Sequence, residues 1–341
     1  AFVLSKRHWA ILGLALIISI TALLSTLSPA SSDEQRCSTT TPNAPQPPIF
    51  KNMNDLTITD AAAHNDLVLV TILIKTDELK TIPALLSLLS SLSYPLDKLD
   101  LAFMLTDPTS GSKALLEHML LHNKNKFRSV SAYAKTISTS LGDDKDSVYE
   151  LQPLIRSALA RARNYLIKSA LRDEHKWILA LDNNVHYVPS NIIEQLMDAD
   201  VDVVVPNCMV QRSDGLLWGF DKSNWRETEV SNVLVEDFQQ DFVLLEASMT
   251  KPPVGFWQLQ THRLLLIDMP TTADRHAKIP LDGIGSCFSL SKAHVHRTGV
   301  IYPPFPYRRA IDTEGFAQMA KASGFGVYGL PGVQVQHAPE P

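Results

Sequence analysis

Three consecutive polar residues, Asp182, Asn183 and Asn184, follow the apolar run WILAL and precede a turn that contains Pro189. In parallel α/β sheets, ligands bind at the carboxyl ends of strands, where loops and helix N-termini meet. A carboxylate at such a strand end can therefore contact a ligand. Asp and Asn also cap turns and accept buried hydrogen bonds, and this stretch alone leaves both interpretations open.

Basic and amide side chains gather on one helix-like segment, LIRSALARARNYL. Arg156, Arg163 and Asn164 fall on neighbouring turns of this helix, whereas Arg161 falls on another face. Arginine suits bidentate contacts with phosphate, although an arginine on a helix face is often simply solvated. The segment is therefore a candidate for binding a phosphorylated ligand.

Further candidate residues lie in the last quarter of the chain. Asp282 lies in the segment LDGIGSC, whose glycines permit either the close approach of a ligand or a bulge. Asp312 and Glu314 begin a helix-like segment, where capping alone also favours acidic residues. His337 is either a metal ligand or a surface histidine. Taken together, these positions indicate one chemical site more strongly than any of them does alone.

The elements that must position these residues alternate between strand and helix. Continuous apolar runs rich in β-branched residues predict buried strands, and apolar residues at spacings of three and four predict helices. This order favours an α/β fold with a mostly parallel central sheet. The predicted strands are 66–74, 99–106, 176–182, 201–206, 242–245, 262–267 and 287–290, and the predicted helices are 82–92, 151–171, 190–197 and 313–324.

Composition argues against a nucleic-acid-binding protein. The chain has 31 Lys and Arg against 36 Asp and Glu, a formal charge of −5, and no basic stripe interleaved with aromatic residues. Hydrophobic residues make up 45% of the sequence, which is enough for a sizeable core.

Three cysteines do not make a disulfide framework. Cys208 and Cys287 lie in apolar, strand-like segments and are interpreted as small buried hydrophobic side chains. Cys37 lies in a polar stretch, where it either forms an intermolecular disulfide or stays unpaired.

The N-terminal region predicts a membrane anchor. Residues 9–27 are uncharged and follow a basic cluster within residues 1–8. As a helix they would extend roughly 28 Å, close to the hydrocarbon thickness of a bilayer. The basic cluster places residues 1–8 in the cytosol and the rest in the lumen. Residues 28–64, rich in Ser, Thr and Pro, predict a flexible stem, and residues 65–341 form one luminal domain. A cleaved signal peptide is the alternative.

The order of several motifs resembles that of fungal Golgi mannosyltransferases of glycosyltransferase family 62, the subunits of mannan polymerases. The resemblance covers about residues 66–337. It is carried by the stretches ARARNYL, HKWILALDNNV, VDVVVPNC, LDGIGSCFSLSKAHVHRTGVIYPPFP and DTEGFAQMAKASGFGVYGLPGVQVQH.

This resemblance implies a GT-A fold, a nucleotide-sugar-binding α/β domain, in a type II protein of the Golgi membrane. It implies transfer of mannose from GDP-mannose, with retention of configuration, to a mannose-containing glycan acceptor, forming α-1,6 linkages in α-mannan on glycoproteins. It also implies a divalent cation, Mn²⁺ or another, and homologous subunits in a hetero-oligomer.

The resemblance also implies a metal site formed by Asp182, Asn184 and His337. Asn184 stands where the family has the second aspartate of an Asp-x-Asp motif. An amide oxygen can still coordinate a hard cation, but one negative charge is lost. A catalytically weak or inactive subunit that supports an active homologue is therefore the alternative function.

The remaining residues that the resemblance implies divide between donor and acceptor. We expect Asp282 and Glu314 to be catalytic, accepting hydrogen bonds from mannose or acceptor hydroxyls. The expected donor-binding residues are Thr76, Asp77, Arg163, Asn164 and Asp182.

Overall fold

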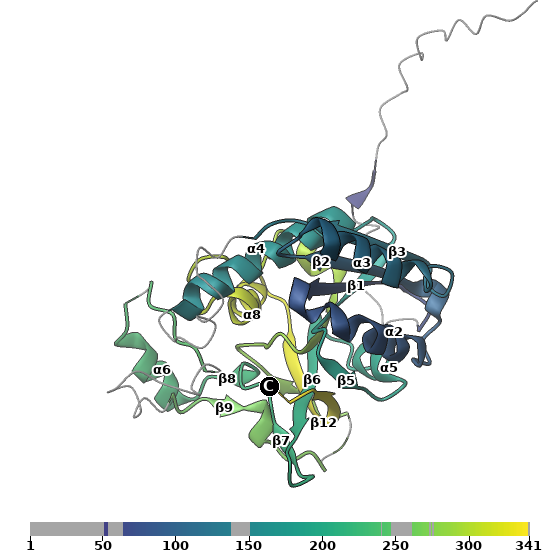
Figure 1. Ribbon diagram of the computed structural model, residues 1–341. Coiled ribbons are helices and arrows are strands. Elements are labelled where there is room, and N and C mark those ends of the chain that lie inside the picture. Colours follow the sequence, from purple (N-terminus) through teal and green to yellow (C-terminus); the bar gives the residue numbers. More distant parts are fainter. Residues whose placement is uncertain are drawn as a thin grey trace, which may run out of the picture. The chain divides into compact units, whose positions relative to one another are not determined.

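A mixed ten-stranded sheet forms the centre of the unit that spans Asn52–Pro341 (Figure 1). The computed structural model describes residues 51–53, 64–137, 151–239, 241–246, 261–272, 274 and 276–339. The strands of the main path follow the order β10-β12-β6-β11-β4-β1-β2-β3, with β5 beside β12 and β7 beside β6. Their bounds are β1 Leu67–Ile74, β2 Leu99–Leu105, β3 Ser129–Ala134, β4 His175–Leu181, β5 Val185–Tyr187, β6 Val203–Gln211, β7 Leu217–Gly219, β10 Ile279–Pro280, β11 Phe288–Lys292 and β12 Val327–His337.

Most neighbouring long strands of this sheet run parallel. Strands β3, β2, β1 and β4 form a parallel set, and β6 runs parallel to β12. Strand β11 lies between β4 and β6 and is antiparallel to both. Because β4, β6 and β12 therefore point the same way, their carboxyl ends meet at one edge of the sheet. The predicted α/β fold with a mostly parallel sheet is confirmed.

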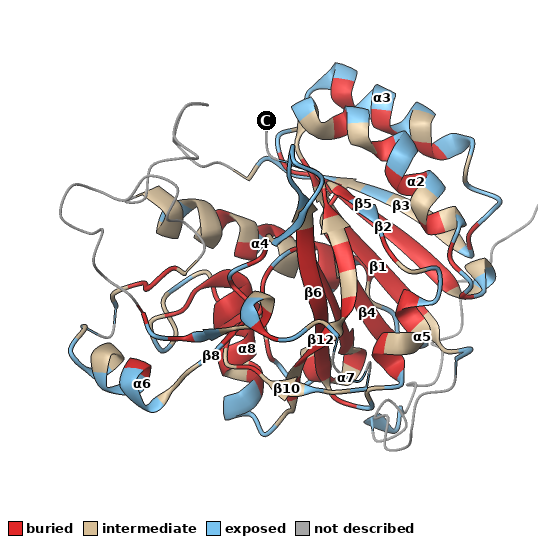
Figure 2. Ribbon diagram, turned by 90° about the horizontal axis from the view of Figure 1, so that it is seen from below, coloured by how far each residue is buried: buried red, intermediate tan, exposed pale blue. Residues whose placement is uncertain are grey.

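Helices cover both faces of the sheet because its strands are apolar on both sides. In β1, Val68, Val70 and Ile72 belong to one buried cluster and Leu69 to the other, as the alternation of side chains along a strand requires. Figure 2 shows buried residues along the central strands and exposed outer surfaces on α2 and α3. The first face carries α2 Ile82–Ser90, α3 Ser110–Leu121 and α5 Ile192–Met197, and the second carries α4 Gln152–Ala170, α7 Ala293–Arg297 and α8 Asp312–Ala322.

A smaller substructure lies beside the second face. It contains helix α6 Glu229–Glu236 and a two-stranded sheet of β8 and β9. Short 3₁₀ helices connect the larger elements. The remaining bounds are β8 Trp225–Arg226, β9 Leu264–Leu265, η2 Thr76–Thr81, η3 Leu96–Lys98 and η6 Leu266–Asp268.

Several elements differ from those predicted. The predicted strand 242–245 is wrong: its apolar residues are buried in a loop, and the N–H of Leu244 donates to the carbonyl of Arg309. The predicted strand 262–267 is reduced to the two residues of β9. Helix α3 and strands β3 and β12 were not predicted. Strand β12 contains Pro331, and its pairing with β6 shifts register there, so its sequence resembles a loop.

A disulfide joins Cys208 of β6 to Cys287, the residue before β11. The interpretation of these cysteines as unpaired hydrophobic side chains is therefore wrong. Both cysteines are buried, so the apolar sequence around each of them is the same as that of any buried segment. Pairing could not be deduced from sequence because the two positions are 79 residues apart. Cys37 lies outside the described residues.

The predicted anchor 9–27 and the start of the stem also lie outside the described residues. Among the helices that the structure does describe, none combines the length and apolar character needed to span a membrane.

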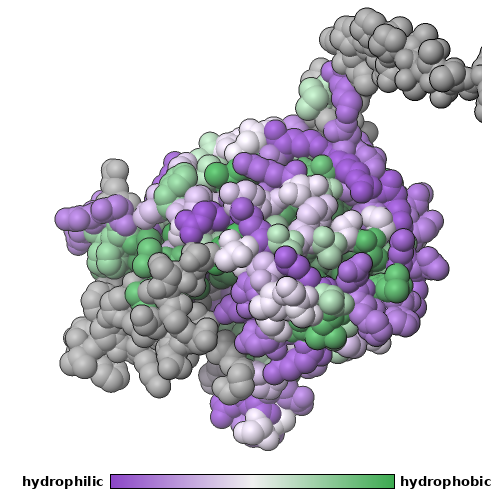
Figure 3. All heavy atoms as spheres, turned by 45° about the horizontal axis from the view of Figure 1, so that its top comes forward, coloured by the Kyte–Doolittle hydropathy of each residue, from purple (hydrophilic) through white to green (hydrophobic). Residues whose placement is uncertain are grey.

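Hydrophilic side chains predominate on the face seen in Figure 3, and hydrophobic ones form small separate patches. Single exposed apolar residues are normal on protein surfaces. The large exposed hydrophobic side chains of the described residues include Leu121, Tyr165 and Trp218.

The disulfide between Cys208 and Cys287 should stabilise the folded chain. Replacing both cysteines, Cys208→Ser with Cys287→Ser, should lower the free energy of unfolding by about 4 kcal/mol, because it frees a loop of this length in the unfolded chain. Chemical denaturation with and without a reductant measures the effect. Reductant should lower the free energy of unfolding of the native chain but leave that of the double variant unchanged. Equal free energies of unfolding for the native chain and the double variant, both without reductant, would contradict the prediction.

The burial of His296 should make the stability of the protein depend on pH. Its ring stacks on Phe316 at 4.9 Å, and burial lowers its pKa to about 3. Below about pH 6.5 the unfolded chain binds a proton that the folded chain excludes, so the free energy of unfolding falls by about 1.4 kcal/mol for each pH unit. Between pH 7.5 and pH 5 the free energy of unfolding should fall less for His296→Phe than for the native chain. The variant keeps an aromatic ring stacked on Phe316, and chemical denaturation at the two pH values measures the difference. An equal loss in both proteins would refute this role.

Candidate active site

The turn after β4 is fixed by backbone hydrogen bonds. Asp182 donates its N–H to the carbonyl of Cys287 at 3.0 Å, and its Oδ1 accepts the N–H of Asn184 at 2.8 Å. An aspartate that bonds the backbone two residues ahead stabilises a turn. The side chain of Asp182 is nevertheless 29% exposed, so its carboxylate serves the turn and still reaches the surface.

His337, at the end of β12, faces this carboxylate. The distance from its Nε2 to Oδ1 of Asp182 is 3.4 Å. The ring stacks on Phe220 at 3.9 Å, and Ala338 donates its N–H to the carbonyl of Asn184 at 2.9 Å. Strand pairing of β12 with β5 therefore brings His337 to the Asp182 turn. Burial alone would raise the pKa of Asp182, but the hydrogen bond and charge of His337 outweigh it and hold that pKa below its usual value.

Asp182 and His337 have the geometry of two ligands of one cation. Adjacent octahedral ligands at about 2.1 Å from an ion lie about 3 Å apart, close to the separation observed here. Nδ1 of His337 bonds the carbonyl of Ala338 at 2.6 Å, the usual arrangement for a metal-binding histidine. Asn184 lies on the same turn, and its Nδ2 donates to Oδ1 of Asn183 at 3.3 Å. Within the described part of the chain, no group of three His, Cys, Asp or Glu residues could hold a metal.

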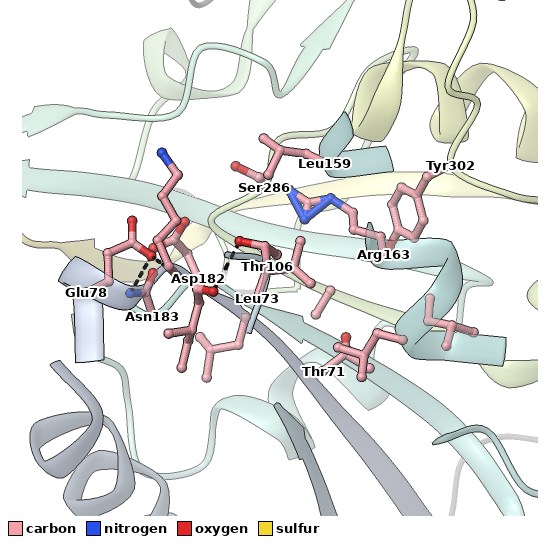
Figure 4. A pocket seen from close by; sticks show the side chains of 16 residues that line it. Thr71, Leu73, Glu78, Thr106, Leu159, Arg163, Asp182, Asn183, Ser286 and Tyr302 are labelled. Atoms are coloured by element: carbon pink, nitrogen blue, oxygen red, sulfur yellow. Dashed lines mark hydrogen bonds between the residues drawn. The ribbon is translucent and has the colours of Figure 1, made fainter. Parts of the chain in front are cut away.

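A cavity of about 210 Å³ opens beside Asp182, at the carboxyl ends of β1 and β4 and against α4. In Figure 4, Glu78, Asn183 and Asp182 gather on one side of it and Arg163 and Tyr302 on the other. The cavity therefore combines acidic and amide groups, an arginine and an aromatic ring. Its size and mixed polarity suit part of a small organic ligand.

Asn183 and Glu78 support each other on the first side of the cavity. Nδ2 of Asn183 donates to Oε2 of Glu78 and to Oγ1 of Thr81, each at 3.3 Å. Burial raises the pKa of Glu78, and the backbone N–H of Lys75 opposes this shift. The sequence singled out neither role. Asn183 was visible only as a neighbour of Asp182, and Glu78, which lies in η2, was not singled out.

Two arginines of α4 pair with acidic residues at the start of α8. Nε of Arg163 donates to Oδ1 of Asp312 at 3.1 Å, and Nη1 of Arg156 donates to Oε1 of Glu314 at 3.2 Å. Burial raises the pKa of Asp312, while the charge of Arg163 opposes the shift. Glu314 is fully buried, and its Oε2 has no hydrogen-bond partner. The two pairs hold Arg163 at the cavity wall.

Three other residues expected at the site are not among those that line the cavity. Thr76 donates its N–H to Oδ1 of Asp107 at 2.7 Å, just beyond Lys75 of the cavity wall, and the neighbouring Asp77 is exposed. Asn164 forms two hydrogen bonds with the backbone of Tyr302. These bonds give Asn164 a positioning role: they fix the chain that carries the aromatic ring of the cavity.

Asp282 lies apart from the Asp182 cavity. It follows β10 beside the first residues of β12, whereas His337 ends β12. Its carboxylate contacts the ammonium group of Lys321 and accepts the N–H of Glu227 at 2.8 Å. The catalytic role of Asp282 stays a prediction that this position does not favour.

The glycines after Asp282 have a packing reason. A Cβ on Gly285 would lie 1.8 Å from Oδ2 of Asp221. That buried carboxylate accepts N–H groups from Ser223 and Cys287, at 3.1 and 3.3 Å, and burial raises its pKa. Asp221 thus orders the loop that leads to the partner strand of Asp182. No sequence pattern indicated this role of Asp221.

A family profile described as Anp1 matches residues 50–306. The chain belongs to the Anp1 family. The matched region contains Asp182 and Asp282 and ends before Glu314 and His337.

Curated relatives of this Anp1-family chain are named as mannan polymerase subunits. The "Mannan polymerase II complex anp1 subunit" of Schizosaccharomyces pombe is 32% identical over 264 residues, which are 74% of this chain and 60% of that subunit. The "Mannan polymerase complex subunit mnn9" of the same yeast is 32% identical over 262 residues, 73% of this chain and 74% of the relative. This chain thus spans less than two thirds of the first relative.

Among solved structures, a mannosyltransferase from Pyrobaculum calidifontis in complex with GDP-Man and Mn²⁺ aligns with 80% of this chain and 57% of its own. The TM-score is 0.43 and the sequence identity 14%.

Loss of one partner of the ion pair between Arg163 and Asp312 should destabilise the folded chain. Asp312→Ala should lower the free energy of unfolding by about 3 kcal/mol or more, because it leaves a largely buried guanidinium unpaired. Chemical denaturation measures this loss. Asp312 also has a φ of +54°, so Asp200→Ala, at an exposed aspartate with a φ of +44°, is the control for backbone strain. Equal losses in the two variants would exclude a contribution from the ion pair.

Proposed function

We propose that this chain is a glycosyltransferase subunit that moves mannose from GDP-mannose to an α-mannan chain on glycoproteins, forming α-1,6 linkages with retention of configuration. The observation that carries the proposal is the meeting of Asp182 and His337 beside the cavity at the strand ends. Membership of a family whose curated relatives are named as mannan polymerase subunits supports it. The GT-A fold and family 62 are parts of this proposal.

The donor would lie with its diphosphate between Asp182 and Arg163. Arg163, held by Asp312, supplies a fixed guanidinium for the phosphate oxygens. Asp182 and His337, with Asn184 as a weaker ligand, would hold a divalent cation such as Mn²⁺. That cation would neutralise the charge that develops on the leaving diphosphate. The rest of the cavity would receive part of the nucleoside.

Transfer breaks the bond between C1 of mannose and the diphosphate oxygen and forms a bond from C1 to an acceptor hydroxyl oxygen. The acceptor proton passes to an oxygen of the departing GDP. Oε2 of Glu314 is buried and without a partner, and it is the proposed acceptor of a hydrogen bond from a sugar hydroxyl. The ion pair with Arg156 orients this carboxylate.

A second candidate function rests on Asn184. An amide in place of a second carboxylate removes one negative charge from the cation site, which weakens metal affinity. The chain would then be a catalytically weak subunit that supports an active homologue in a mannan polymerase complex.

The proposal also covers the partners of the chain and its location in the cell. Homologous subunits of a hetero-oligomer are the proposed partners. Residues 9–27 would anchor the chain in the Golgi membrane as a single-pass type II protein, with residues 65–341 in the lumen.

Calorimetric titration of the full chain with GDP, with and without Mn²⁺, tests the function. We expect binding that strengthens with Mn²⁺, and Asp182→Ala should weaken the metal-dependent binding by about a hundredfold, because it removes a ligand of the cation. Asn184→Asp should strengthen it, because it restores a negative charge.

Asp97→Ala is the matched control, since Asp97 is exposed at the opposite edge of the sheet. Metal-dependent binding that survives Asp182→Ala would exclude the assigned site. Binding that requires Asn184→Asp would favour the catalytically weak subunit. Transfer of mannose to an α-mannoside acceptor by the native chain would favour the enzyme.

A further inference from the structure

A hairpin extends β6 beyond the Asp182 site. Strand β6 continues to Gln211, turns at Gly215 and returns as β7 (Figure 1). Val210 of β6 pairs with His337 on one side and with Trp218 of β7 on the other. Directly opposed residues of neighbouring strands point to the same face of a sheet. Trp218 therefore lies in one row with His337, two strands away.

Aromatic rings follow this row outward from the site. Phe220 stacks on His337 with an interplanar angle of 12°. Trp218 lies two residues before Phe220, so its side chain continues on the same side of the hairpin. Whereas His337 is buried, Trp218 is 57% exposed. The series thus begins at the proposed cation site and ends in solvent.

Polar groups flank the exposed ring of Trp218. The guanidinium of Arg212 lies 5.1 Å from the ring centroid, and Nη2 of Arg212 lies 3.4 Å from Oδ2 of Asp214. The side chains of Leu216 and Leu217 at the hairpin tip are also exposed. Exposed apolar groups rimmed by charged ones mark sites of ligand or partner binding. The turn of the hairpin is formed by Gly215, which has a φ of +82°. Trp218 is therefore not needed to form the turn.

We propose that Trp218 is a platform on which the oligosaccharide acceptor stacks, outside the transfer centre. The proposal rests on the proposed function, because it assigns the acceptor of the same site. The C–H groups on one side of a pyranose form an apolar face that packs on a flat aromatic ring. The hydroxyl groups at the sugar edge match the donors of Arg212 and the acceptors of Asp214.

Continuity with the site favours a glycan over a protein partner. Two strand spacings separate Trp218 from His337, a distance of roughly 10 Å. One sugar unit at the transfer centre does not reach that far, whereas an acceptor of several units does. Trp218 therefore contacts a sugar remote from the reacting hydroxyl, and its contribution depends on acceptor length.

The test is binding of α-mannotetraose and of methyl α-mannoside to the full chain, measured by calorimetry beside GDP with Mn²⁺. We expect Trp218→Ala to weaken tetraose binding about tenfold, as truncation of a stacked tryptophan typically does. Binding of the monosaccharide and of GDP should not change. Trp218→Phe, which keeps a ring, should restore most of the tetraose affinity.

Tyr165→Ala is the matched control. Tyr165 is 46% exposed on α4, and Lys135 lies over its ring at 4.4 Å, as Arg212 lies near Trp218. Equal tetraose affinity of Trp218→Ala and the native chain would overturn the proposal, as would a native chain that binds no tetraose. Loss of self-association in Trp218→Ala with unchanged tetraose affinity would overturn it in favour of a protein interface. Failure of GDP binding with intact tetraose binding would count against the donor site alone.

Discussion

The meeting of three strand ends is the constraint on which the site depends. Asp182 directly follows β4, and its backbone N–H bonds the carbonyl of Cys287, which directly precedes β11. His337 ends β12, which is bonded through Ala338 to the turn that carries Asn184. The residues come from distant parts of the sequence, so only the sheet can bring them together. Because β4, β6 and β12 point the same way, their ends present side chains at one edge.

Electrostatics between α4 and α8 orient the opposite wall of the cavity. Arg156 and Arg163 on α4 each pair with an acid at the start of α8. Such pairs contribute little net stability, because removing the charges from water offsets their attraction. Their effect is geometric: they fix the relative position of two helices and the direction of one guanidinium. The cavity therefore has one wall set by strand pairing and another set by buried charges.

The sequence predicted the class of fold because long apolar runs identify buried strands without tertiary information. It also singled out Asp182, Arg163 and His337, which the structure brings to the region of one cavity, and their roles stay predictions. Positions that depend on distant contacts were missed. The glycines after Asp282 suggested the close approach of a ligand or a bulge, but Gly285 is small because Asp221 packs against it. The disulfide was missed because pairing of Cys208 with Cys287 follows from the antiparallel placement of β11, which no local pattern encodes.

The position of β12 in the sheet has a consequence for biogenesis. It is the last strand of the described sequence, yet it lies between β10 and β6. While the ribosome is still adding these residues, β6 has an open edge, and such edges pair readily with other chains. Until β12 is synthesised and paired, the nascent protein therefore needs protection of this edge. The proposed cation site assembles at the same moment, because the strand that closes the edge also delivers His337.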